Sequence, residues 1–279
     1  LSLTILTMDF IDLDTGTNQL LAQKRAGVGV ITLSRPKAKN ALSPKLSPAL
    51  RKMIQKMGED DEVGAVIITG AGEAFCAGGD VKGMGISDGP VLTVDQKISR
   101  LLEGQRQLTG ALVNLRKPVI AAIPGPAVGA GLSLALACDI RIGSLSSFIT
   151  TGYARVGLSG DYGISSLLTR AVGSGRAREL MFTAERIDSK KCLELGIYNR
   201  IVADDELLDY SMSFAEELAR GPRKAFALMK DNLNDALVLN FEASLDSEAP
   251  RLIEAMASSD HKEAVRAFAE KREPVFGGN

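Results

Sequence analysis

The sequence has little of what several classes of protein need. Its 279 residues include one histidine, three cysteines and no tryptophan, and only 5% are aromatic. The single histidine, His261, excludes a histidine-rich metal site, and no Cys/His cluster has the spacing of a zinc site. Cys76, Cys138 and Cys192 are odd in number and widely spaced. We therefore expect buried, reduced thiols in a cytoplasmic protein rather than a disulfide framework, and no bound metal.

An excess of charge of one sign is also missing. Lysine and arginine total 33 against 34 aspartates and glutamates, a net charge of −1, and no acidic or basic block stands out. This balance disfavours a dedicated nucleic-acid or membrane-surface binder. Prolines and glycines interrupt the longest apolar run, residues 119–138, so we expect a strand, a loop and a helix there rather than a membrane span. The apolar start of the chain has no basic region and turns acidic, which makes it a poor signal peptide.

Strand and helix patterns alternate over the first two thirds of the chain. A hairpin is predicted over residues 20–25 and 28–34, and further strands over 63–69, 117–123 and 138–144. Helices are predicted from about Pro44, with Ser43 as its N-cap, over 95–115 and over 130–137. From residue 204 onward the pattern is only helical. We expect an α/β body over residues 1–205 and a helical region over 206–279.

Two glycine-rich loops each follow a short apolar strand. The first is "EAFCAGGDVKGMG", residues 73–85, and the second lies within "IPGPAVGAGLSLALACD", residues 123–139. Glycine allows unusual backbone angles and lets the backbone approach a ligand closely. Two such loops that converge can hold one oxygen between two N–H donors, which is an oxyanion hole. Tight turns are the alternative, since neither a dinucleotide fingerprint nor a P-loop is present.

Four motifs resemble the enoyl-CoA hydratase/isomerase (crotonase) superfamily. They are "RPKAKNAL" (residues 35–42), "GAGEAFCAGGDVKGM" (70–84), "KPVIAAIPGPAVGAGLSLALACDIRI" (117–142) and "FITTGYARVGLSGDYGISSLLTRAVG" (148–173). The resemblance runs from about residue 19 to 276, and its pattern is nearest to the 1,2-epoxyphenylacetyl-CoA isomerase branch. It implies a spiral of ββα units with a helical trimerisation region, assembled as trimers or dimers of trimers. It also implies an acyl-CoA thioester substrate, with CoA entering as part of that substrate and no further cofactor.

The resemblance also implies which residues form the site. The two oxyanion donors map onto the backbone N–H groups of Ala77 and Ala130. The residues expected to contact the substrate are Lys37, Lys39, Ala41, Ala77, Gly78, Asp80, Val81, Gly129, Ala130, Ser133 and Tyr153. Lys37 and Lys39 would lie near the CoA phosphates, although solvated surface charges are the alternative. Asp80 would anchor its own loop by accepting backbone N–H bonds, and Asp139 would have a capping or pairing role.

The reaction is less well specified than the family. Hydratases of this family hold water with two glutamates, and the corresponding positions here are Ser133 and Tyr153. One carboxylate remains in a suitable place, Asp161, where some isomerases of the family carry an acidic residue. A single aspartate can move a proton from one carbon to another; its alternative role is the N-cap of the next helix. We therefore expect an isomerase, with a hydratase and a non-catalytic acyl-CoA-binding protein as alternatives.

Overall fold

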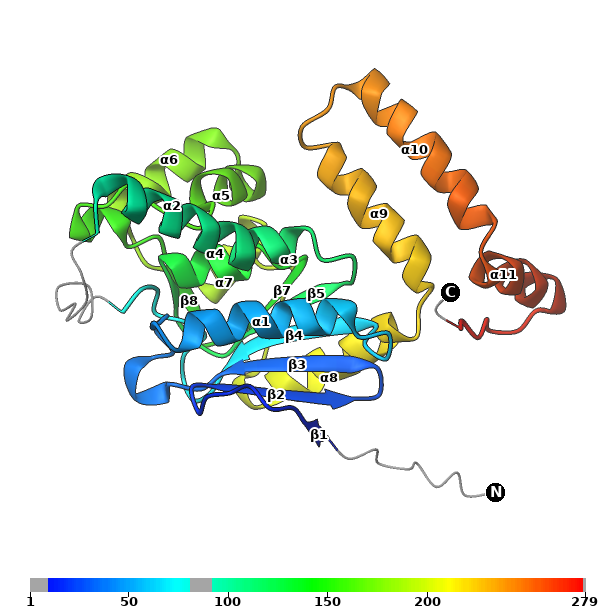
Figure 1. The fold of residues 1–279 in the computed structure, drawn as a ribbon, viewed down its shortest axis with the longest axis horizontal. Helices are drawn as coiled ribbons and strands as arrows, with labels where there is room; N and C mark the ends of the chain where they lie inside the picture. The colour runs from blue at the N-terminus through cyan, green and yellow to red at the C-terminus, as the bar shows by residue number, and fades with distance from the viewer. Residues whose placement is uncertain (1–9, 81–91, 278–279) are drawn as a thin grey trace.

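The computed structural model describes residues 10–80 and 92–277, so Val81 and its predicted substrate contact lie outside the described residues. The strands are β1 Ile11–Asp12, β2 Leu20–Arg25, β3 Val28–Leu33, β4 Ala65–Gly70, β5 Val119–Ile123, β6 Ala127–Val128, β7 Ile140–Ser144, β8 Phe148–Thr150, β9 Ile187–Asp188 and β10 Arg200–Val202. A seven-stranded sheet in the order β1-β2-β3-β4-β5-β7-β10 forms the centre of the molecule (Figure 1). Its first three strands pair antiparallel and the rest pair parallel. A second sheet joins β6, β8 and β9.

Helices cover both faces of the large sheet. They are α1 Leu46–Glu59, α2 Val94–Gln105, α3 Ala111–Val113, α4 Ala130–Leu136, α5 Ile164–Val172, α6 Ser174–Thr183, α7 Ser189–Glu194, α8 Leu207–Ala219, α9 Arg223–Asp235, α10 Phe241–Met256 and α11 Ser259–Glu270. Five residues of π-helix, Arg106–Gly110, join α2 to α3, so the single helix predicted over 95–115 is one continuous but irregular helical segment. The predicted strands and helices are otherwise present, with ends that differ by a few residues.

The alternation of side chains along the strands builds two cores. In β4, Val66 and Ile68 face the core that contains α1, α4 and α5, while Ala65 and Ile67 face the core formed with α8. Successive strand residues point to opposite faces, so a strand covered on both sides reads as one apolar run. The apolar stripe of α1 is buried as predicted, through Leu46, Leu50, Met53, Ile54 and Met57. Ser43 lies ahead of that helix, and its hydroxyl accepts hydrogen bonds from the amides of Lys45 and Leu46.

The predicted helical region, residues 206–279, divides into two parts by packing. α8 lies against the sheet and contributes Leu207, Met212 and Ala215 to the second core. By contrast, α9, α10 and α11 extend away from the body as an arm (Figure 1). Large apolar side chains on the arm face solvent: Leu233, Leu237, Val238, Phe241, Leu252, Ile253, Val265 and Phe268 are each more than half exposed. The body contains the site loops described below, and α8 belongs to it.

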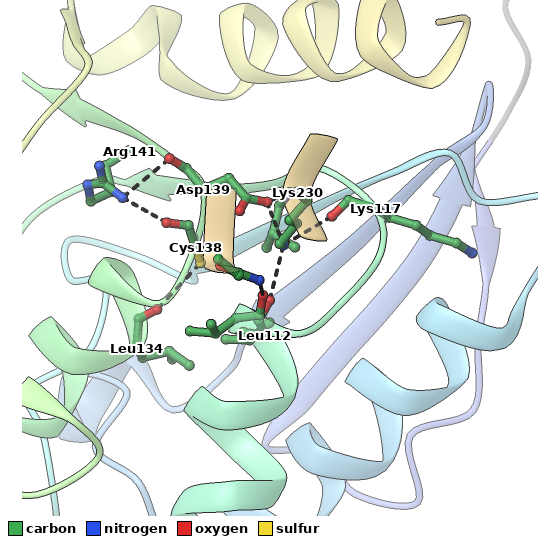
Figure 2. Close-up of polar contacts among 10 residues, drawn as sticks. Leu112, Lys117, Leu134, Cys138, Asp139, Arg141 and Lys230 are labelled. Atoms are coloured by element: carbon green, nitrogen blue, oxygen red, sulfur yellow. Dashed lines mark hydrogen bonds and ion pairs between the residues drawn. The ribbon is translucent and has the colours of Figure 1, made fainter. Parts of the chain in front are cut away.

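A buried lysine fastens the arm to the body. Lys230 of α9 is 9% exposed, and its Nζ lies 2.8 Å from Oδ2 of Asp139 and 3.2 Å from the carbonyl oxygen of Leu112 (Figure 2). Asp139 also accepts a hydrogen bond of 2.8 Å from the amide of Val119, at the start of β5. The predicted pairing role of Asp139 is therefore confirmed. Burial raises the pKa of this carboxyl, and Lys230 acts against the rise.

Composition also raised questions about the cysteines, about membrane helices and about metal ligands. Cys76, Cys138 and Cys192 are free and buried. Among residues 10–80 and 92–277, no helix is long and apolar enough to cross a membrane. In the same ranges, no group of histidine, cysteine and acidic side chains could hold a metal ion.

Candidate functional site

The two glycine loops lie at the carboxyl ends of neighbouring parallel strands. The first loop leaves β4 and the second leaves β5, and these strands pair directly. Ligand sites in parallel sheets form at this edge. The loops are also joined to each other: the amides of Phe75 and Cys76 both donate to the carbonyl of Pro126, at 3.1 Å, and the amide of Val128 donates to the carbonyl of Cys76, at 2.9 Å. The sequence prediction that the loops converge is confirmed.

The glycines allow this close approach. Gly78 has a φ of +90°, and a Cβ there would lie 2.8 Å from the carbonyl oxygen of Val128 and 3.5 Å from the amide nitrogen of Ala130. In α4, a Cβ on Gly131 would lie 2.2 Å from the carbonyl oxygen of Cys76. Side chains at either position would push the loops apart. The first loop and the start of α4 are therefore packed backbone against backbone.

Ala77 does not offer a free N–H group. Its amide donates a 2.9 Å hydrogen bond to the carbonyl of Lys39, so the sequence-based assignment of this residue as an oxyanion donor conflicts with the geometry. The amide of Gly78 lies beside the thiol of Cys76. Burial raises the pKa of that thiol to about 12, and the Gly78 amide acts against the rise. The backbone of Leu42 donates to the carbonyl of Gly78 and accepts from the amide of Asp80. The amide of Gly79, between them, has no acceptor among the residues described. Among the described residues that follow Ala77 in this loop, Gly79 is therefore the candidate donor, two residues after Ala77.

Ala130 agrees better with its predicted role. It is the first residue of α4, and the preceding Gly129 has a φ of +54°. The amide of Ala130 meets no hydrogen-bond acceptor in the described part of the chain, as expected for the first turn of a helix. Gly129 itself donates to the carbonyl of Thr150, at 3.1 Å. Gly78 precedes Gly79 in the chain, and a Cβ on Gly78 would lie 3.5 Å from the amide nitrogen of Ala130, so the amides of Gly79 and Ala130 belong to the same junction of loops.

The sequence reasoning missed two residues that hold the first loop. Asn40 is fully buried and has a φ of +57°. Its amide group donates to the carbonyls of Ala71 and Ala74, at 3.0 and 2.7 Å, and its oxygen accepts from the amide of Arg35. The Arg35 guanidinium then bonds the carboxylate of Asp80 at 2.9 Å. Asp80 is an anchor, as predicted, but the partner that the structure describes is this arginine rather than a backbone N–H group.

The remaining candidates form a second polar cluster. The hydroxyl of Tyr153 donates to Oδ1 of Asp161 over 2.7 Å. The hydroxyl of Ser133, on α4, lies 3.2 Å from the backbone oxygen of Asp161 and 3.4 Å from the Tyr153 hydroxyl. A Cβ on Gly129 would lie 3.9 Å from the Tyr153 ring. Ser133, Tyr153 and Asp161 therefore meet beside the start of α4, as their predicted roles require.

The N-cap alternative for Asp161 is wrong. The N-cap of α5 is Gly163, and no side chain caps this helix. Only the backbone carbonyl of Asp161 takes part, by accepting from the amide of Ile164 at 3.2 Å. The carboxyl group turns toward Tyr153 instead. Burial raises its pKa, and the hydrogen bond from Tyr153 opposes that rise.

The predicted CoA contacts lie on the other side of the first loop. Lys37 and Lys39 are exposed, in and after a 3-10 helix at Pro36–Ala38, and Ala41 is buried. The Ala41 carbonyl accepts a hydrogen bond from Arg35. The exposed lysines agree equally with either of their predicted roles. A cavity of about 810 Å³ lies elsewhere, between Gly27, Ala219 and the segment Pro274–Phe276.

Known proteins resemble the chain over nearly its whole length. The family model described as "Enoyl-CoA hydratase/isomerase" matches residues 23–279. A short-chain-enoyl-CoA hydratase of Clostridium acetobutylicum is 35% identical, over 91% of this chain and 96% of that protein. A 1,2-epoxyphenylacetyl-CoA isomerase of Escherichia coli is 32% identical, over 93% and 98%. The crystal structure of an enoyl-CoA hydratase from Polaromonas sp. JS666 superposes with a TM-score of 0.85 at 30% identity, over 92% of this chain and 99% of that one.

These similarities confirm the predicted superfamily and its fold. The chain belongs to the enoyl-CoA hydratase/isomerase family.

Proposed function

We propose that this member of the family is an acyl-CoA isomerase, which takes a proton from the α-carbon of a CoA thioester and returns it to another carbon. The observation that carries the proposal is the carboxylate of Asp161 beside the start of α4, hydrogen-bonded to Tyr153 at 2.7 Å. The two glutamate positions of the family's hydratases are occupied by Ser133 and Tyr153. A site with one carboxylate suits proton transfer between two carbons better than activation of a water molecule by two acids.

The thioester oxygen would be held by the amides of Gly79 and Ala130. Neither amide meets an acceptor among the described residues, and both lie at the junction of the two loops. We therefore assign the first oxyanion donor to Gly79 in place of Ala77. Removal of the α-proton moves negative charge onto the thioester oxygen. Two fixed N–H groups stabilise that charge more than they stabilise the ground state, which lowers the barrier. Loss of one such donor typically costs about 3–4 kcal/mol in barrier height.

Asp161 would be the proton carrier. Burial raises the pKa of its carboxyl above the ordinary value, which makes the carboxylate a stronger base once it is ionised. The base must be deprotonated to accept a proton. The rate is therefore expected to fall as the pH drops through this raised pKa, and to level off above it. As the pH is lowered, activity should therefore decline at a higher pH than it would if the catalytic aspartate were exposed and had an ordinary pKa.

Membership of the family supports the substrate and the assembly that we propose. CoA would enter as part of the thioester, with the exposed Lys37 and Lys39 near its phosphates. The exposed apolar side chains of α9, α10 and α11 favour association with further copies of the chain. We propose a homotrimer or a dimer of trimers for this assembly.

Hydration of a 2-enoyl-CoA is the second candidate, because the relatives named above include a short-chain-enoyl-CoA hydratase. A panel of saturated, 2-enoyl, 3-enoyl, ring-epoxide and arylacetyl CoA esters separates the two. Isomerisation leaves the product mass unchanged, whereas hydration adds one water. Turnover of 3-enoyl or ring-epoxide esters without added mass, lost in Asp161→Asn at unchanged ester affinity, supports the proposal. Hydration alone favours the second candidate, and no turnover with any ester indicates a non-catalytic acyl-CoA-binding protein.

A further inference from the structure

Tyr153 occupies a position that the proposed reaction leaves without a role. It begins a 3-10 helix, Tyr153–Val156, and is 6% exposed. Its ring lies beside Gly129 and Gly160, where added Cβ atoms would each approach it to 3.9 Å. A packed core tyrosine would need only this ring. The hydroxyl, however, reaches the carboxylate of Asp161 over 2.7 Å, the length of a charge-assisted hydrogen bond.

The distances within the cluster indicate which acceptor each hydroxyl proton is directed toward. The Tyr153 hydroxyl has one proton, and its shortest contact is Oδ1 of Asp161. The Ser133 hydroxyl has its shortest contact with the backbone oxygen of Asp161, at 3.2 Å. Asp161 is therefore bonded at two points: Ser133 of α4 bonds its backbone oxygen, and Tyr153 bonds its carboxylate. Oδ2 of Asp161 accepts no hydrogen bond from any described residue.

We propose that Tyr153 is the positioning residue of this site: its hydroxyl holds Oδ1 of Asp161, which leaves Oδ2 as the oxygen that takes and returns the substrate proton. This inference rests on the proposed function. In the forward step the α-carbon C–H bond breaks, an O–H bond forms at Oδ2, and the electron pair moves into the thioester to form the enolate. In the return step the O–H bond breaks and a C–H bond forms at the second carbon. Tyr153 keeps its own proton throughout, and nothing is oxidised or reduced.

Tyr153 also affects the titration of Asp161. Its hydrogen bond lowers the pKa of a carboxyl that burial raises. The other titratable groups nearby are Tyr162, next in the chain, and beyond it Arg51 of α1 and the Cys76 thiol. Burial raises the pKa of Tyr153, of Tyr162 and of Cys76, so these groups remain neutral between about pH 5 and 8. A change of rate with pH in this range then reports on Asp161.

The test compares the pH profiles of Tyr153→Phe and wild type, with 3-hexenoyl-CoA or phenylacetyl-CoA as the probe, whichever the wild-type enzyme turns over or exchanges. Phenylalanine keeps the ring and removes the hydrogen bond. We expect the acid limb of kcat/KM to move to higher pH, with a loss of roughly ten- to a hundredfold at pH values below the wild-type limb and little loss above the shifted limb. The matched control is Tyr198→Phe, since that hydroxyl is buried beside Ser147 and Cys192; its profile should not move.

A direct titration makes the result independent of activity. In protein labelled with 13C at the aspartate carboxyl groups, the Asp161 signal, assigned by its absence in Asp161→Asn, should titrate at higher pH in Tyr153→Phe than in wild type. A uniform loss of activity at every pH, or an unmoved Asp161 titration in a variant that folds normally, would overturn the inference. If Asp161→Asn keeps wild-type turnover, the proposed function fails. If that variant is inactive and the Tyr153→Phe profile is unshifted, only the role of Tyr153 fails.

Discussion

The site loops and the C-terminal arm are held in opposite ways. The first loop is fixed by backbone contacts to two other segments, by the buried side chain of Asn40 and by glycines that admit no side chain. The arm, α9 to α11, is fastened to the body by polar side chains such as Lys230, and it leaves large apolar residues in solvent. The described residues of the site are therefore held by contacts within their own chain, whereas the arm has apolar surface that only another surface can bury.

This difference predicts separable effects of mutation. Changes in the loops should alter catalysis and leave assembly intact, because the loops contact their own chain. Changes on the arm should alter stability or assembly and leave the chemistry of a folded subunit nearly unchanged. The variants below test this separation.

Gly78→Ala should have the largest effect among the changes to the loop backbone and the arm. The new Cβ would lie 2.8 Å from the Val128 carbonyl oxygen at a φ of +90°, so the loop that carries Gly79 must shift away from α4. We expect kcat to fall by about 10²–10³-fold, the typical cost of a lost oxyanion donor, with the oligomeric state unchanged. Gly175→Ala in α6 is the control, because a Cβ there meets nothing within 4 Å. Equal kinetics for both variants would contradict the assigned geometry.

Lys230→Met should lower stability. It removes the partner of Asp139 and leaves the backbone oxygen of Leu112 without this donor. The free energy of unfolding should fall by about 1–3 kcal/mol, at the lower end because the Asp139 side chain is 31% exposed. Urea unfolding measures this loss. The double variant Lys230→Met/Asp139→Asn should recover part of it, and strict additivity of the two single changes would show that the pair is not coupled.

Phe268→Asp should act on assembly alone. Phe268 of α11 is 87% exposed in the single chain, so an aspartate costs a lone subunit little but places a charge in any interface formed there. Sedimentation velocity should show a shift toward smaller species. Phe182→Asp in α6, at a residue 76% exposed on the body, is the matched control. A wild-type assembly for Phe268→Asp would remove this part of the arm from the interface.

On stability, Asp161→Asn should have the smallest effect, and this effect should be a gain near neutral pH rather than a loss. The folded state raises the pKa of this carboxyl by burial, so ionisation costs stability once the pH exceeds the unfolded value of about 3.9. That cost grows until the pH passes the folded pKa, and it is absent below the unfolded one. The Tm of the variant should therefore exceed that of wild type at pH 7, and the difference should shrink toward pH 4. A lower Tm for the variant at pH 7 would show that the hydrogen bond from Tyr153 outweighs burial.

Most of the fold could be predicted from local pattern. The five longer strands of the large sheet and the stripe of α1 carry clear apolar patterns, and the glycine loops could be identified by composition. The short strands β1, β6, β8, β9 and β10 were not predicted, because two or three residues carry no periodicity. The packing of α8 against the sheet was also missed, since its sequence does not show which surface it covers.

The site was predicted less completely, because its details depend on contacts between distant segments. Whether Ala77 or Gly79 has the free amide depends on Lys39 and Leu42. The carbonyl of Lys39 accepts from the Ala77 amide, and Leu42 bonds the residues on either side of Gly79. The role of Asn40 has a weak signal, since asparagine tolerates the left-handed backbone found there. The choice between capping and catalysis for Asp161 required knowledge of the direction of its side chain, toward Tyr153 rather than toward α5.

The most direct measurement is exchange of α-protons with D2O, followed by 1H NMR, for butyryl-CoA and phenylacetyl-CoA. Neither ester can be hydrated or isomerised, so exchange reports only the proton transfer and the stabilised enolate. We expect wild-type protein to exchange the α-protons of at least one ester, and Asp161→Asn to do so about 10²–10⁴-fold more slowly while binding the ester equally well. Exchange at the wild-type rate in Asp161→Asn, or none with either ester in wild type, would contradict the assignment of Asp161 as the proton carrier.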